Sequence, residues 1–107
     1  MRYLIISAYF LLTITESVAA QCKLERVIGY TLVAAKTVVA HIDDGKREDG
    51  FSGCTYGRIL VFDDNTGVRC AEYNYEYAYR PDAYIFVRGG SIKMCIEGYL
   101  YDANSLN

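Results

Sequence analysis

The chain has 107 residues, with 11 basic and 13 acidic side chains, one His, four Cys, 11 Tyr and no Trp. This length allows a single domain, and a net charge of −2 leaves no broad cationic surface, which argues against nucleic acid as a partner. A single His excludes a multi-His metal cage within one chain, and no cofactor is expected.

The first twenty residues, MRYLIISAYFLLTITESVAA, have the layout of a secretory signal peptide, with Arg2 before an apolar run and small residues at the end. A transmembrane anchor is one alternative, but the apolar run is shorter than the ~20 residues of a bilayer span. Lipidation at Cys22 is another, although Gln21 stands where that pattern has a small residue. We therefore expect a secreted or periplasmic protein, without a stable membrane anchor after cleavage, whose single domain spans residues 21–107.

All four cysteines lie beyond this segment: Cys22, Cys54, Cys70 and Cys95. An even number of cysteines in a short exported chain indicates two disulfides. The spacing contains no C-x-x-C pair, which argues against zinc, and a catalytic thiol paired with His41 is a weaker alternative still. We expect the pairs Cys22–Cys54 and Cys70–Cys95, because the hairpin predicted below places Cys70 opposite Leu60 and away from Cys54. A free pair or an intermolecular bridge stays open.

β-Branched and aromatic residues occur in short blocks separated by Gly, Asp and Asn, and no segment keeps a helical pattern over three turns. The blocks predict an all-β domain, a small antiparallel barrel of five or six strands, SH3-like or OB-like in size and stabilised by disulfides. The first block, Val27 to Ile42, is long enough to need a bend at residues 34–36, with a helix through Leu32–Ala40 as the local alternative. The charged segment Asp43–Gly53 is expected to be a solvated, flexible loop.

Two hairpins are predicted. The first joins residues 57–63 to residues 68–72 around Asp64-Asn65-Thr66-Gly67, so that Phe62 faces Val68. The second joins residues 83–88 to residues 91–97 through Gly89-Gly90, because two glycines tolerate the positive φ of a primed turn. With Arg88 opposite Ser91, this register gathers one core layer, consisting of Ile85, Val87, Ile92, Met94 and Ile96.

The segment YNYEYAYR carries four tyrosines at alternate positions, Tyr73, Tyr75, Tyr77 and Tyr79, followed by Arg80. In a strand all four rings would project from one face. We expect this face to point mainly inward, because Asn74, Glu76 and Arg80 make the opposite face the wetter one. The alternative is an exposed aromatic strip that stacks on sugar rings or on a peptide. An inward strip requires a bulge or strand break near Ala71-Glu72, where the apolar face changes from even to odd positions.

No catalytic or metal-binding residue is predicted. The acidic residues of the charged segment lack the spacing of an EF-hand, and Asp63-Asp64 is typical of a turn. Two carboxylates could perform acid–base chemistry only if the fold brought them across a cleft.

The stretch GRILVFDDNTGVRCAEYNYEYAYRP, with GYTLVAAKTVVAHIDDG upstream, resembles a group of small exported bacterial β-proteins of unassigned function. The resemblance implies an extracytoplasmic β-protein and supplies no catalytic or binding residues.

We therefore expect a non-enzymatic exported module that acts by binding or as a structural element. Its contact surface would be the tyrosine segment with Arg80, and its partner a protein or a glycan. The alternative is a small inhibitor or effector that inserts the segment Asp43–Gly53 into a protein target. A hydrolase is a third possibility, for which no nucleophile–base pair can be named.

Overall fold

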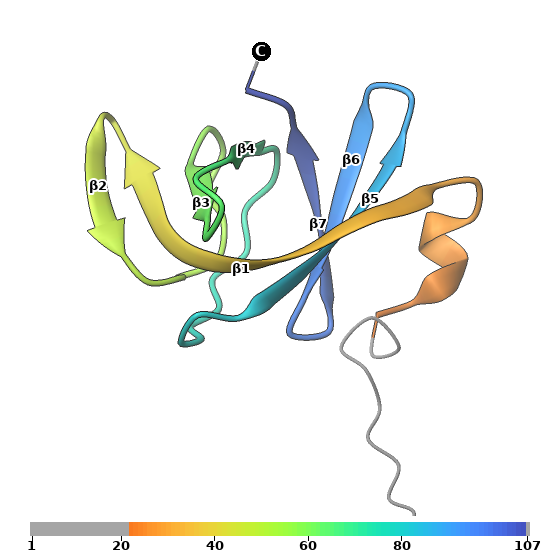
Figure 1. The fold of residues 1–107 in the computed structure, drawn as a ribbon, viewed down its shortest axis with the longest axis horizontal. Coiled ribbons are helices and arrows are strands. Elements are labelled where there is room, and N and C mark those ends of the chain that lie inside the picture. Colours follow the sequence, from red (N-terminus) through yellow and green to blue (C-terminus); the bar gives the residue numbers. More distant parts are fainter. Residues whose placement is uncertain (1–21, 107) are drawn as a thin grey trace, which may run out of the picture.

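A computed structural model describes residues 22–106 of the chain (Figure 1). The predicted signal peptide, residues 1–20, lies outside these residues. The elements in chain order are a 3-10 helix η1 (Leu24–Val27) and the strands β1 (Thr31–Asp43), β2 (Lys46–Asp49), β3 (Ile59–Phe62), β4 (Gly67–Cys70), β5 (Asp82–Arg88), β6 (Ser91–Ile96) and β7 (Tyr99–Asn104).

The strands form one antiparallel sheet that closes on itself. Its order is β2-β1-β3-β4-β7-β6-β5, and an additional pairing of β1 with β5 closes six of the strands into a barrel, with β2 as an extra edge strand. The all-β class and the small barrel predicted from the sequence are thus confirmed. Closure removes the free edges that an open sheet of this size would expose.

Strand β1 is long enough to pair with three other strands along its length. Residues 31–37 pair with β5, whereas the second part of the strand pairs with β3 on one side and β2 on the other. The register shifts between Leu32 and Ala34 and again between Val38 and Ala40, so irregularities flank the bend predicted at residues 34–36. The alternative helix through Leu32–Ala40 is wrong, since this segment is a continuous curved strand (Figure 1).

The β5–β6 hairpin has the predicted register. Arg88 lies opposite Ser91, Val87 opposite Ile92 and Ile85 opposite Met94. The interior side of this hairpin belongs to the main core, in which the predicted layer packs around the fully buried Tyr101. The outer side of β5, β6 and β7 is covered by η1, where Val27 and Cys22 complete a second apolar cluster.

The β3–β4 hairpin has a different register from the predicted one. Val68 lies opposite Leu60 and not opposite Phe62. Phe62 N donates to Thr66 O at 2.8 Å, which leaves a turn of only Asp63, Asp64 and Asn65. Asn65 adopts the left-handed conformation at φ 69, a conformation that Asn tolerates better than most residues, so the shorter turn can close.

This shift changes the disulfide pairing. The bonds are Cys54–Cys70 and Cys22–Cys95, so the predicted pairs Cys22–Cys54 and Cys70–Cys95 are wrong. Cys70 lies next to Arg58, where Cys70 N donates to Arg58 O at 2.7 Å. The chain then folds back through a tight turn at residues 55–58, in which Gly57 has φ 86, and this return brings Cys54 to Cys70. Two disulfides indicate an oxidising environment.

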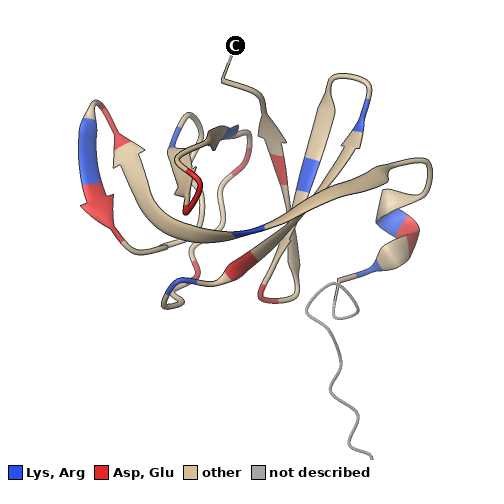
Figure 2. Ribbon diagram, viewed as in Figure 1, with Lys and Arg blue, Asp and Glu red and all other residues tan. Residues whose placement is uncertain are grey.

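The charged segment Asp43–Gly53 is an ordered hairpin arm rather than a flexible loop. Asp44 and Gly45 both have positive φ, which makes them a two-residue primed turn, and β2 pairs back onto β1 from Lys46 to Asp49. Figure 2 shows the resulting edge strand, basic in its first half and acidic in its second, on the outside of the barrel. Arg58 holds the base of this arm through two 2.8 Å bonds to the Asp43 carboxylate, which lower the pKa of Asp43.

Candidate functional site

The four tyrosines of the segment between β4 and β5 are exposed. Tyr73, Tyr75, Tyr77 and Tyr79 have exposed fractions of 62%, 70%, 69% and 80%, and we call these four side chains the tyrosine strip. The expectation that this face points inward is therefore wrong. The strand does end at Cys70, close to the predicted break, but the break does not turn the tyrosines inward. The segment is extended, with isolated bridges at Asn74 and Ala78 and no regular strand.

Asn74 and Glu76 turn inward because a buried hydroxyl requires partners. Tyr101 is fully buried on β7, and its hydroxyl donates to Glu76 Oε1 at 2.6 Å while accepting from Asn74 Nδ2 at 3.1 Å. Burial raises the pKa of Tyr101, and the bond to the Glu76 carboxylate raises it further. The polar side chains expected on the wetter face are thus used to satisfy the core.

Glu72 makes a second attachment to β7. Its carboxylate accepts hydrogen bonds from the Tyr99 hydroxyl at 2.7 Å and from Asp102 N at 2.8 Å. The bond to Glu72 raises the pKa of Tyr99. With Asn74 and Glu76, this contact fixes three alternate positions of the segment to one strand, which leaves the intervening tyrosines facing solvent.

The other side of the segment lies against residues 51–54. Cys54 and Asn74 exchange two backbone hydrogen bonds of 2.9 Å, and Ala78 N donates to Phe51 O. Gly53 crosses so close that a Cβ atom built on it would lie 2.0 Å from Asn74 O, and its φ of 82° also favours glycine. The strip is therefore displayed from a backbone that is held on both sides.

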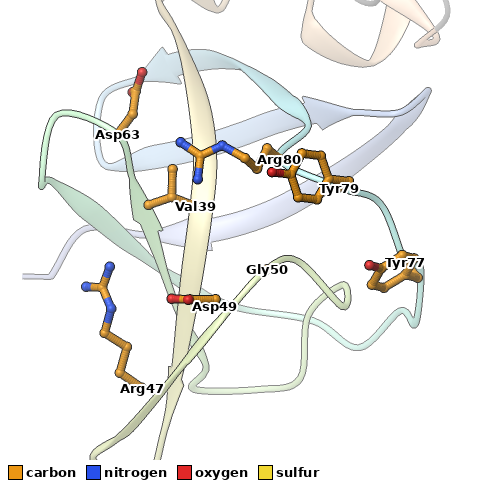
Figure 3. Close-up of a pocket in the computed structure, with 8 residues that line it drawn as sticks. All are labelled: Val39, Arg47, Asp49, Gly50, Asp63, Tyr77, Tyr79 and Arg80. Atoms are coloured by element: carbon orange, nitrogen blue, oxygen red, sulfur yellow. The ribbon is translucent and has the colours of Figure 1, made fainter.

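Two members of the strip, Tyr77 and Tyr79, border an open groove of about 570 Å³. The remaining lining residues are Val39, Arg47, Asp49, Gly50, Asp63 and Arg80. Figure 3 shows Arg80 reaching over Val39 of β1, with Arg47 and Asp49 on the β2 side and Asp63 at the far end. Tyr77, Tyr79 and Arg80 were predicted from the sequence as contact residues, whereas the contribution of β2 was not. The Asp-Gly turn of the charged segment was the signal that could have predicted it.

Arg80 has an unusual backbone conformation. Its φ is 46°, and among the described residues it is the one non-glycine position with positive φ that lies outside a hairpin turn. The following residue, Pro81, is buried, and its carbonyl accepts a 2.9 Å bond from Val38 N. This bond fixes the chain direction at Arg80, and left-handed φ at a non-glycine residue costs roughly 1–2 kcal/mol.

The other chemical candidates have structural roles. His41 is buried, and its Nδ1 lies 2.9 Å from Gly50 O, which joins β1 to the end of the hairpin arm. A catalytic thiol paired with His41 is ruled out, because all four cysteines form disulfides. In residues 22–106, no three His, Cys, Asp or Glu side chains are grouped so that they could hold a metal ion. None of the helical structure in this range is long and apolar enough to span a membrane.

Comparison with protein-family models, with curated proteins and with solved structures finds no match to this chain.

Proposed function

We propose that this protein is a non-enzymatic binding module, exported through the signal peptide predicted at residues 1–20. Its contact surface is the tyrosine strip together with Arg80 and the adjoining groove. One observation carries the proposal: the segment from Tyr73 to Tyr79 has Asn74 and Glu76 inward and its four aromatic residues outward. The inward Asn74 and Glu76 satisfy the buried Tyr101 hydroxyl, but folding does not require aromatic side chains at the four outward positions, because apolar area is stabilising when it is buried.

The side chains in question are those that binding surfaces favour. Tyrosine offers a large, flat area with two side-chain torsions to fix, and arginine offers five donors in a planar fork. Both residue types are enriched where affinity is concentrated in interfaces. The fixed backbone under the strip also lowers the entropy that a partner must overcome.

The test is the double variant Tyr75→Ala/Tyr77→Ala, with Tyr56→Ala as a matched control because Tyr56 is 75% exposed and does not line the groove. The disulfide-bonded protein, immobilised, is exposed to the native exported fraction of its source. We expect the double variant to lose its partner and to keep its melting temperature, while the control keeps both. A double variant that melts lower and retains every partner would show that the strip is structural.

The ordered hairpin arm supports a second candidate, an inhibitor or effector that inserts residues 43–53 into a protein target. The arm is held by four pairs to β1 and by the Arg58–Asp43 ion pair, so it is presented in a defined shape. The variant Asp44→Ala/Lys46→Ala in the same capture experiment separates the two candidates. Loss of the partner from this variant alone would favour the arm.

A hydrolase has less support. Asp49 and Asp63 line the same groove, but both side chains are exposed. A general acid in a hydrolase needs burial or a close like charge to raise its pKa.

A further inference from the structure

The groove beside the tyrosine strip contains charged side chains that no neighbour neutralises. Within residues 22–106, the guanidinium groups of Arg47 and Arg80 and the carboxylate of Asp49 have no hydrogen-bond or ion-pair partner. By contrast, Arg58 and Lys93, elsewhere on the barrel, are each paired with an aspartate at 2.8 Å or less. The groove therefore keeps its donors and acceptors available for a ligand.

The two free arginines approach the groove from opposite sides. Figure 3 shows the guanidinium of Arg80 extended over Val39 and that of Arg47 rising from β2, with the Asp49 carboxylate on the β2 side. Each of these guanidinium groups is unpaired within the described part of the chain, and an unpaired guanidinium can bind an incoming carboxylate through parallel N–H donors. The left-handed backbone of Arg80, at φ 46°, is consistent with this interpretation, because such conformations are concentrated at ligand sites.

The remaining features favour a sugar over a protein. The hydroxyls of Tyr77 and Tyr79 point toward the groove (Figure 3), and Asp49 and Asp63 supply acceptors for ligand hydroxyl groups. Protein interfaces have an apolar centre, yet the large exposed aliphatic residues lie elsewhere, at Leu24, Ile28, Leu32, Val33 and Leu106. Strand addition at β2 is disfavoured as well, because all four of its residues are charged, a pattern that blocks edge pairing.

We propose that the groove binds an acidic linear glycan, with a sugar carboxylate held between Arg47 and Arg80. A sugar ring stacks on Tyr77 or Tyr79, and the ring hydroxyls donate to Asp49 and Asp63. An open groove that continues into a row of tyrosines fits a polymer of repeating flat units better than a small enclosed ligand. This inference rests on the proposed function of the strip and names the ligand class of that surface.

The test compares two probes, tetragalacturonic acid and its fully methyl-esterified form, by titration calorimetry with the disulfide-bonded protein. We expect the acid to bind about tenfold more tightly than the ester, because the ester cannot pair with the arginines. The affinity of the acid should fall as salt is raised, because salt screens these ion pairs. Arg80→Gln and Arg47→Gln should each weaken binding of the acid about tenfold. Arg69→Gln is the matched control, since Arg69 is an exposed arginine on β4 that does not line the groove, and it should leave affinity unchanged.

Equal binding of acid and ester, or full affinity in Arg80→Gln, would overturn the carboxylate site. If neither oligosaccharide binds and the variant Tyr75→Ala/Tyr77→Ala still loses a protein partner from the exported fraction, the glycan inference is wrong and the proposed function stands. If the same variant retains every ligand and partner, both are wrong.

Discussion

The hydroxyl of Tyr101, inside the barrel on β7, donates a 2.6 Å hydrogen bond to Glu76, which lies between two tyrosines of the exposed strip. Asn74 donates to the same hydroxyl from two residues earlier. A buried phenol thus determines which side of the segment faces outward. The orientation of the tyrosine strip is therefore a consequence of polar satisfaction in the core.

Tyr101→Phe should lower the free energy of unfolding by about 1–3 kcal/mol, because it leaves the half-buried Asn74 and Glu76 without their partner. Urea denaturation measures this change. Tyr99→Phe is the matched control, since it also removes a hydroxyl from β7 but lies at a more exposed position. It should have the smaller effect. Two equal losses would contradict the central role of Tyr101.

Stability should also decrease at alkaline pH. The pKa of Tyr101 is raised above the ordinary value of 10.0, so the folded protein holds this proton more tightly than the unfolded chain. The contribution of Tyr101 is therefore fully present below about pH 10 and is lost as pH rises toward the folded-state pKa. Urea midpoints between pH 8 and 11 should fall for the wild type and fall less for Tyr101→Phe. Parallel slopes for the two proteins would show that other groups control the decline.

The sequence predicted those parts of the fold that local chemistry decides. Gly89-Gly90 predicts a two-residue primed turn, and a turn of that length fixes the register from Ile85 to Met94. The turn at Asn65 was harder to predict, because Asn tolerates a left-handed φ without requiring it. The observed register of the β3–β4 hairpin differs by two residues from the predicted one. Cys70 therefore lies at a different position along β3 from the predicted one, and both disulfide pairs differ from the predicted pairs.

The candidate site was only partly predictable. Alternation identified the tyrosines as a set, but their direction depends on Tyr101, which is about 25 residues away in the sequence. From their polarity alone, Asn74 and Glu76 would be predicted to face solvent. They face inward because the buried hydroxyl of Tyr101 lies on that side of the segment. Arg47 reaches the groove because Asp44-Gly45 forms a hairpin, a local signal obscured by the high charge around it.

Gly53→Ala should be more destabilising than Gly50→Ala. Both glycines have positive φ, 82° and 98°, so both variants carry a backbone penalty of roughly 1 kcal/mol. Gly53 additionally faces the backbone of Asn74 and Glu76, whereas nothing lies within 4 Å of a Cβ at Gly50. The free energies of unfolding of the two variants, measured side by side, isolate this contact. Similar values would mean that the segment can move away from residues 51–54.

The two disulfides should differ in their effect on stability. The Cys22–Cys95 bond closes a loop of 73 residues and the Cys54–Cys70 bond a loop of 16. Loop entropy then gives about 4 kcal/mol for the first and about 3 kcal/mol for the second. Paired Cys→Ala variants and thermal melts measure the losses. Peptide mapping without reduction checks the connectivity, and a peptide linking Cys22 to Cys54 would contradict the pairing.

Binding and stability should separate at Arg80. Asn adopts a left-handed φ more readily than Arg, so Arg80→Asn should leave stability unchanged or raise it by up to about 1 kcal/mol. The same change removes a guanidinium from the groove and should weaken binding of the acidic oligosaccharide about tenfold. Glu97→Asn is the matched control, because Glu97 has φ 51 in a hairpin turn and does not line the groove. It should gain similar stability and keep full affinity. A parallel loss of stability and affinity in Arg80→Asn would instead assign Arg80 a role in folding.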